Sequence, residues 1–171
     1  PGRVSDQRAL IEGVADADIR EQLEHLWQVA PDFVAEQADA IDGRAYDVVG
    51  FSSTFNQNLA SLALARELKA RWPHLAIVFG GPNAEGVMGE ALLAQFDFVD
   101  YVVSGEGDRA LPQLVRAIRG EGAGGPLAVP GVRGRLADGG IGGPKAPGFV
   151  SLDRVAYPDF DDYLAALDGT E

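Results

Sequence analysis

The chain has 171 residues, the length of one domain with a short appendage. Its formal charge of −12 disfavours contact with phosphate backbones, so we expect no nucleic-acid partner. It contains no cysteine, which excludes disulfides, thiolate nucleophiles and cysteine-held clusters within the chain and fits a reducing cytoplasm. No apolar run approaches the roughly 18 residues of a membrane span, so we expect no membrane partner.

Residues 1–45 are expected to form a helical N-terminal segment. Within residues 18–29, Ile19, Leu23 and Leu26 recur at the spacing of one helix face. Pro31 followed by Asp32 is typical of a helix start, so the pattern predicts that a second helix begins there.

Residues 46–120 alternate between short apolar runs and amphipathic segments. The predicted strands are residues 46–52, 75–79 and 99–103. The predicted helices are residues 56–72, residues 85–96 and a segment that ends at Gly120, for which Asp108 is the expected N-cap. Strands joined by helices of this length form right-handed parallel crossovers. The fold class is therefore α/β, with a Rossmann-like (flavodoxin-like) parallel sheet flanked by helices.

Glycine and proline dominate residues 121–150, which we expect to be a linker. Within it, residues 129–136 suit a strand, and residues 138–140 suit a hairpin turn that returns through Ile141. Residues 151–171 mix aromatic and acidic side chains and are expected to be a connector. Their carboxylates fit no calcium loop, so we expect a solvated acidic surface at Asp159, Asp161 and Asp162.

Ligands of open parallel sheets bind beyond the carboxyl ends of the strands, where three loops of this chain are expected to meet. These loops offer hydroxyl and amide groups, and glycines that let the backbone approach a bulky ligand. The candidate cofactor-binding residues are Ser52, Ser53, Thr54, Phe55, Asn56, Gln57, Gly80, Gly81, Pro82, Asn83, Gly105, Glu106 and Gly107. Such residues also cap helices or form tight turns, so the pattern alone indicates a pocket and not its occupant.

Four ordered blocks resemble radical SAM enzymes that mature ribosomally synthesised peptides. They are residues 51–65 (FSSTFNQNLASLALA), 78–86 (VFGGPNAEG), 99–108 (VDYVVSGEGD) and 157–163 (YPDFDDY). The resemblance runs from about Tyr46 to Ile118 and resumes in the tail. It implies a Rossmann-type cobalamin-binding domain in which the loop of residues 52–57 and the Gly80–Gly81 turn hold the corrin and its nucleotide tail. The loop of residues 105–107 would lie near the corrin edge or the domain junction.

The parent enzyme implied by this resemblance is a cobalamin-dependent C-methyltransferase acting on a precursor peptide. There, cobalamin donates a methyl group to a substrate radical generated with S-adenosylmethionine and a four-iron four-sulfur cluster. The fragment alone offers no nucleophile–base pair and no cluster ligands, so it is not expected to catalyse the reaction.

The chain departs from related patterns in three respects. The D-x-H-x-x-G motif of methionine-synthase-like domains is absent, and His25 and His74 suit surface or packing positions, so no histidine ligand to cobalt is expected. The C-x-x-x-C-x-x-C cluster motif is absent, so the radical barrel is expected beyond Glu171. The usual opening strand–helix–strand is not visible. The strand of residues 46–52 would then have an unpaired edge. Because an unpaired edge can bind another strand, we expect that the chain can self-associate.

Two other functions remain open. One is a non-catalytic α/β interaction module that binds no corrinoid. The other is a nucleotide-dependent enzyme, which requires a phosphate loop; neither G-x-G-x-x-G after a strand nor G-x-x-x-x-G-K-[ST] is present.

Overall fold

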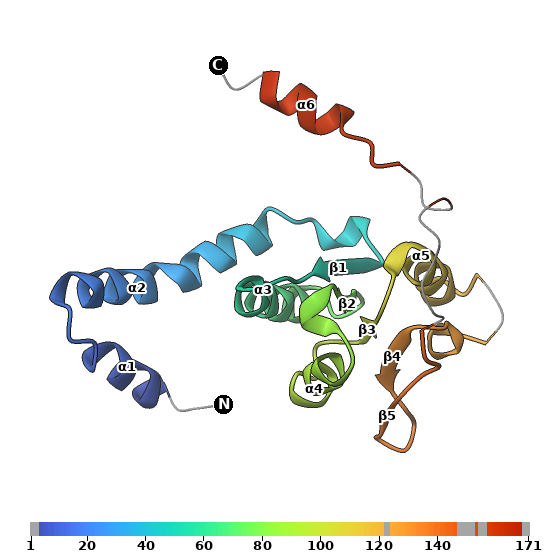
Figure 1. Ribbon diagram of the computed structural model, residues 1–171, viewed down its shortest axis with the longest axis horizontal. Coiled ribbons are helices and arrows are strands. Elements are labelled where there is room, and N and C mark those ends of the chain that lie inside the picture. Colours follow the sequence, from blue (N-terminus) through green and yellow to red (C-terminus); the bar gives the residue numbers. More distant parts are fainter. Residues whose placement is uncertain (1–3, 122–123, 147–152, 154–156, 169–171) are drawn as a thin grey trace.

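The computed structural model describes residues 4–121, 124–146, 153 and 157–168. Its helices are α1 (Val4–Glu12), α2 (Ala17–Asp39), α3 (Gln57–Arg71), α4 (Val87–Gln95), α5 (Gly107–Ile118) and α6 (Asp161–Asp168) (Figure 1). Its strands are β1 (Val48–Ser52), β2 (Ala76–Gly80), β3 (Tyr101–Val103), β4 (Val132–Arg135) and β5 (Ile141–Gly142). Short 3-10 helices also occur between them: η1 (Gly43–Ala45), η2 (Pro82–Ala84) and η3 (Pro126–Ala128).

The strands form one mixed sheet in the order β1-β2-β3-β4-β5. The first three are parallel, whereas β4 and β5 are antiparallel to their neighbours. The Rossmann-like α/β prediction is confirmed. So is the hairpin, closed by a hydrogen bond from the Leu136 amide to the Gly140 carbonyl (2.8 Å). Within the described residues, β1 pairs only with β2, so it is an edge strand as expected.

Alternation along the strands divides the core between the two faces of the sheet. Ile77 and Phe79 point to the face covered by α3 and α4, where Phe79 stacks on Phe51 at a centroid distance of 5.0 Å. Val78 and Val103 point to the opposite face and pack in one cluster with Ala110 and Leu114 of α5. Figure 1 shows where α5 lies relative to α3 and α4. Because both faces of β2 are covered, four of its five residues are buried.

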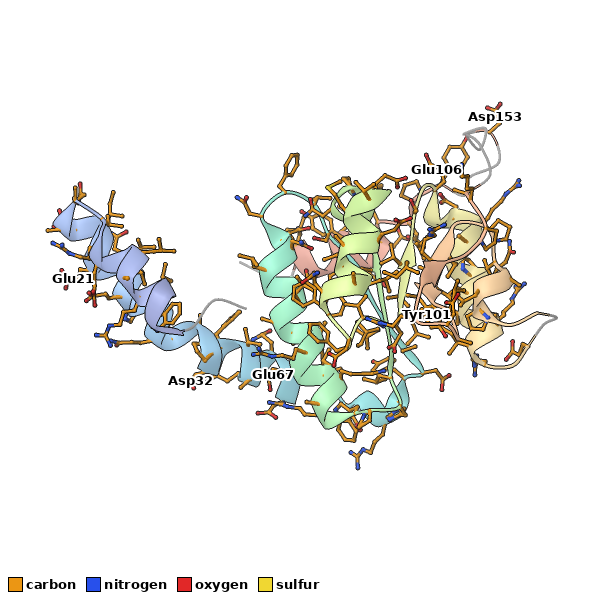
Figure 2. The ribbon with its side chains drawn as sticks, turned by 90° about the horizontal axis from the view of Figure 1, so that it is seen from below. Glu21, Asp32, Glu67, Tyr101, Glu106 and Asp153 are labelled. Carbon is orange, nitrogen blue, oxygen red and sulfur yellow. The ribbon has the colours of Figure 1, made fainter. Side chains whose placement is uncertain are left out.

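Residues 17–39 form one continuous helix, so the prediction of a new helix at Pro31 is wrong. Pro31 lies inside α2 and cannot donate a hydrogen bond to the preceding turn. The helix is exposed over residues 24–33, so water can reach the carbonyl left without a donor. Figures 1 and 2 show α2 extending away from the sheet, with α1 folded back beside it. Its C-terminal end is attached through buried Ala38 and an Arg71–Asp39 ion pair of 2.5 Å.

Two charged side chains connect the layers. The Asp100 carboxylate accepts hydrogen bonds from Lys69 Nζ (2.8 Å) and the Ile77 amide (2.7 Å). Burial raises the pKa of neighbouring Tyr101 above its usual value, and the negative charge of Asp100 raises it further. Arg135 donates to the carbonyls of Leu93, Phe96 and Val99. The β4–β5 hairpin is thereby attached to the C-terminal end of α4.

Another local prediction is wrong. The N-cap of α5 is Glu106, whose side chain makes no capping bond, and Asp108 lies in the first turn of the helix. In the tail, residues 161–168 form α6, and residues 161–167 of this helix are exposed. The carboxylates at Asp159, Asp161 and Asp162 are exposed, as expected. None of the described helices is both long and apolar enough to cross a membrane.

Leu68 tests the core beneath α3. It is fully buried, so Leu68→Ala is expected to lower the free energy of unfolding by about 3 kcal/mol through lost burial and a residual cavity. Leu59 lies on the same helix but is 80% exposed, so Leu59→Ala is the matched control and should change stability by under about 0.5 kcal/mol. Urea denaturation measures both; equal effects would contradict the core assignment.

Candidate functional site

A cleft of about 350 Å³ lies at the carboxyl ends of the parallel strands. It opens on the face of the sheet that α5 covers only in part. Its lining residues are Gly50, Phe51, Ser52, Val78, Gly80, Gly81, Val103, Gly105, Gly107 and Leu111. They come from the first three strands, the loops after β2 and β3 and the start of α5, so the cleft lies where the topology predicts a ligand.

Small residues at paired positions create the cleft. In the sheet register Gly50 lies opposite Val78, and Ser52 lies opposite Gly80. Because side chains alternate across a strand, these positions share the face that points toward α5. A Cβ built on Gly50 would meet no atom within 4 Å, so the absence of this side chain leaves open space. The bulky neighbours Val49 and Phe51 pack into the opposite core.

The loops after β1 and β2 are joined through Ser53, which is fully buried. The Ser53 amide donates to the Gly80 carbonyl (2.9 Å), and the Asn83 side-chain amide donates to Ser53 Oγ (2.9 Å). Gly81 adopts a φ of +82°, and a Cβ there would lie 2.9 Å from the Ser53 carbonyl oxygen. Glycine is therefore required at position 81 by both conformation and close approach.

The remainder of the β1–α3 loop is braced internally. The amide and the hydroxyl of Thr54 both donate to Gln57 Oε1, at 2.9 and 3.2 Å. Between them, Phe55 has a φ of +44°, which is unfavourable for a residue with a bulky side chain, and it is 92% exposed. Its carbonyl accepts a hydrogen bond from Asn83 Nδ2 at 3.0 Å. Strained backbone conformations of this kind are concentrated at functional sites.

The loop after β3 provides the third side of the cleft through Gly105 and Gly107. Gly105 has a φ of +81°. Glu106, between the two glycines, lines a neighbouring cavity of about 200 Å³ together with Arg109 and Gln113. Figure 2 shows Glu106 at the edge of the domain, whereas Tyr101 at the start of β3 lies deeper in it.

The structure brings five of the predicted residues together in the cleft: Ser52, Gly80, Gly81, Gly105 and Gly107. The others surround it with different contacts. Ser53 and Asn83 join loops, Thr54 and Gln57 brace their own loop, and Pro82 lies in η2. Asn56 is the N-cap of α3 without a capping bond from its side chain. Phe55 and Asn83 border a separate groove between α3 and α4, and Glu106 lines the neighbouring cavity.

Sequence reasoning missed Gly50, Phe51, Val78, Val103 and Leu111 as lining residues. The alternation of Gly50 and Ser52 along β1 was the available signal, because both must face the same side of the sheet. The apolar run of residues 46–52 predicts a buried strand, but it does not show which side chains point to which face of the sheet.

Among the described residues that line the cleft none has an ionisable side chain, so they can bind and shield a ligand but offer no general acid and no base that would activate the Ser52 hydroxyl. Both histidines lie elsewhere. His25 is exposed on α2, and His74 Nε2 is 3.1 Å from the Gly43 carbonyl oxygen. No cluster of three potential metal ligands occurs among residues 4–121, 124–146, 153 and 157–168.

The sequence matches the model of the B12 binding domain family over residues 14–115, more than half of the chain. The chain therefore belongs to the B12 binding domain family. The match extends from the start of α2 into α5 and includes every lining residue of the cleft. No curated protein matches the sequence at a significant level.

The two glycines at positions 81 and 50 are predicted to differ in their tolerance of a methyl group. Gly81→Ala should lower the free energy of unfolding by about 2 kcal/mol, because it combines a positive φ with a contact to the Ser53 carbonyl. Gly50→Ala should leave stability unchanged or raise it by about 0.5 kcal/mol, since strand glycines lose more entropy on folding. Thermal or urea unfolding measures both. A Gly81→Ala variant as stable as the parent would contradict the described turn.

Proposed function

We propose that this chain holds cobalamin at the carboxyl edge of its sheet, as one domain of a cobalamin-dependent radical SAM enzyme. The observation that carries the proposal is the glycine-floored cleft within the matched B12-binding segment. Gly50 in β1, Gly80 in β2, Gly105 in the loop after β3 and Gly107 at the start of α5 give a ligand direct access to backbone atoms. A cleft of about 350 Å³ would hold part of the cofactor and not the whole of it.

Two properties of the cleft fit cobalamin: it contains open space, and its described lining residues carry no charge. A built Cβ at either Gly50 or Gly107 meets open space, so the cleft is bounded by backbone where side chains would otherwise fill it. No carboxylate is among the described residues that line the cleft, although the chain carries a formal charge of −12. Ser52 contributes a hydroxyl to the lining, which can hydrogen-bond to a polar group of a ligand.

The proposed reaction is methyl transfer to a carbon of a ribosomally synthesised precursor peptide. The four sequence blocks that resemble peptide-maturing radical SAM enzymes support this, and the last of them lies in the tail that contains α6. Bound cobalamin would supply the methyl group, while S-adenosylmethionine and a four-iron four-sulfur cluster would be held by another part of the parent enzyme. The role of this chain is to bind, orient and shield its cofactor.

The test is retention of hydroxocobalamin. The chain is incubated with the corrinoid and desalted, and its visible spectrum is recorded. We expect corrin absorbance at a stoichiometry near one, with a band shape that lacks histidine coordination, because neither histidine lies at the cleft. His25→Ala should leave the spectrum unchanged, since His25 is exposed on α2. A chain that retains no corrinoid would support the alternative of an interaction module without cofactor.

Gly50→Val tests the location of the site. Valine suits a strand and finds open space at position 50, so the variant should be at least as stable as the parent. Its isopropyl group would occupy the cleft, so hydroxocobalamin affinity should fall by at least about tenfold. Gly139→Asn provides the control, because Gly139 lies in the β4–β5 turn outside the cleft and asparagine tolerates positive φ. Unchanged affinity in Gly50→Val would place the ligand elsewhere.

A further inference from the structure

The carboxylate of Glu85 bridges the loop after β2 and the loop after β3. Ser104 Oγ donates to Glu85 Oε1 at 2.8 Å, and the Gly105 amide donates to Glu85 Oε2 at 2.7 Å. The Gly86 amide in turn donates to Ser104 Oγ at 3.2 Å. Both oxygens of one carboxylate are thus used to hold two consecutive residues of the neighbouring loop.

These bonds act on the part of the loop that borders the cleft. The Ser104 amide donates to the Gly131 carbonyl at 2.9 Å, so the Ser104–Gly105 segment is held from two sides. Gly105 has a positive φ and a broad choice of backbone conformations, so external contacts must select one of them. Gly105 and the following Gly107 then line the cleft.

Glu85 itself does not line the cleft. Its side chain borders a separate cavity of about 270 Å³ that also contains Glu90, Arg133 and Lys145. Among the residues that the structure describes, no lysine, arginine or histidine nitrogen is paired with Glu85 within 4 Å, whereas Glu90 pairs with Arg133 at 2.6 Å. Within the described part of the chain, the Glu85 carboxylate therefore accepts its hydrogen bonds from Ser104 and Gly105.

We propose that Glu85 is a positioning residue for the corrinoid, acting through Gly105 to fix the glycine rim of the cleft. The inference rests on the proposed function. Asn83 and Glu85 lie two residues apart and hold opposite neighbours, the loop after β1 and the loop after β3 respectively. The segment of residues 82–86 thereby sets the positions of both loops relative to β2. Removal of Glu85 releases one side of the cleft without removing any atom that lines it.

The first arm of the experiment uses the ligand-free chain. Amide hydrogen exchange is followed by NMR in the wild type, Glu85→Ala and Glu90→Ala. We expect exchange of the Gly105 amide to be about tenfold faster in Glu85→Ala, because its acceptor is lost. The Ser104 amide is the internal reference, since it donates to Gly131. Glu90→Ala removes a carboxylate from the same cavity and should not change Gly105 exchange. Unchanged Gly105 exchange in Glu85→Ala would overturn the inference.

The second arm measures hydroxocobalamin affinity by visible absorbance titration. Glu85→Ala should bind about tenfold more weakly than wild type, as is typical when a group supporting the ligand contacts is lost, whereas Glu90→Ala should bind normally. Glu85→Gln retains one acceptor oxygen for the Gly105 amide and should recover most of the affinity. Equal losses in Glu85→Ala and Glu90→Ala would show a general structural effect and would overturn the positioning role.

The two arms separate failure of this inference from failure of the proposed function. If the wild-type chain binds no hydroxocobalamin, both the proposed function and the positioning role of Glu85 are contradicted. If Gly105 exchange is nevertheless faster in Glu85→Ala, then Glu85 only orders the loop after β3. A wild-type chain that binds normally, together with a Glu85→Ala variant of equal affinity, supports the proposed function and overturns the inference.

Discussion

The cleft depends above all on the hydrogen bonds that radiate from residues 80–86. The Gly80 carbonyl and the Asn83 side chain hold the loop after β1, while Glu85 holds the loop after β3. The three loops are long-range neighbours that share no covalent constraint, so these bonds fix their relative positions. Gly81 permits the arrangement, because any side chain there would collide with the Ser53 carbonyl. The same hydrogen bonds therefore determine both the conformation of the loops and the shape of the cleft.

A second constraint is the unequal use of the two faces of the sheet. On the α3–α4 face, large apolar side chains such as Phe79 and Leu68 fill the space between the layers. On the other face, Gly50, Ser52 and Gly80 leave it unfilled at the carboxyl ends of β1 and β2. The same strands thus provide both stability and a binding surface. The packed face supplies the rigid support that a backbone-lined site needs to keep its shape.

The sequence predicted what depends on local pattern and missed what depends on distant contacts. The apolar runs at β1, β2 and β3, the amphipathic spacing of α3 and the turn at Gly139 were all visible in it. The start of α5 was misplaced at Asp108 because an acidic residue after glycines resembles an N-cap. A new helix was expected at Pro31 because proline is common in the first turn of a helix, but an exposed helix such as α2 can also accommodate proline in its interior. The predicted glycines do line the cleft, but the bridging carboxylate of Glu85 lies 20 residues from Gly105, and no local pattern reveals such a pair.

Gly50 has a consequence for the evolutionary history of sequences like this one. Nothing in the fold requires glycine at that position, since a side chain would meet open space and most other residues would favour the strand. Selection for folding alone would therefore replace it, and only selection for the empty space above it would retain it. Among descendants of a common ancestor, a β-branched residue at this position would mark lineages in which the cleft no longer binds a ligand, even where the sequence of every surrounding loop is preserved.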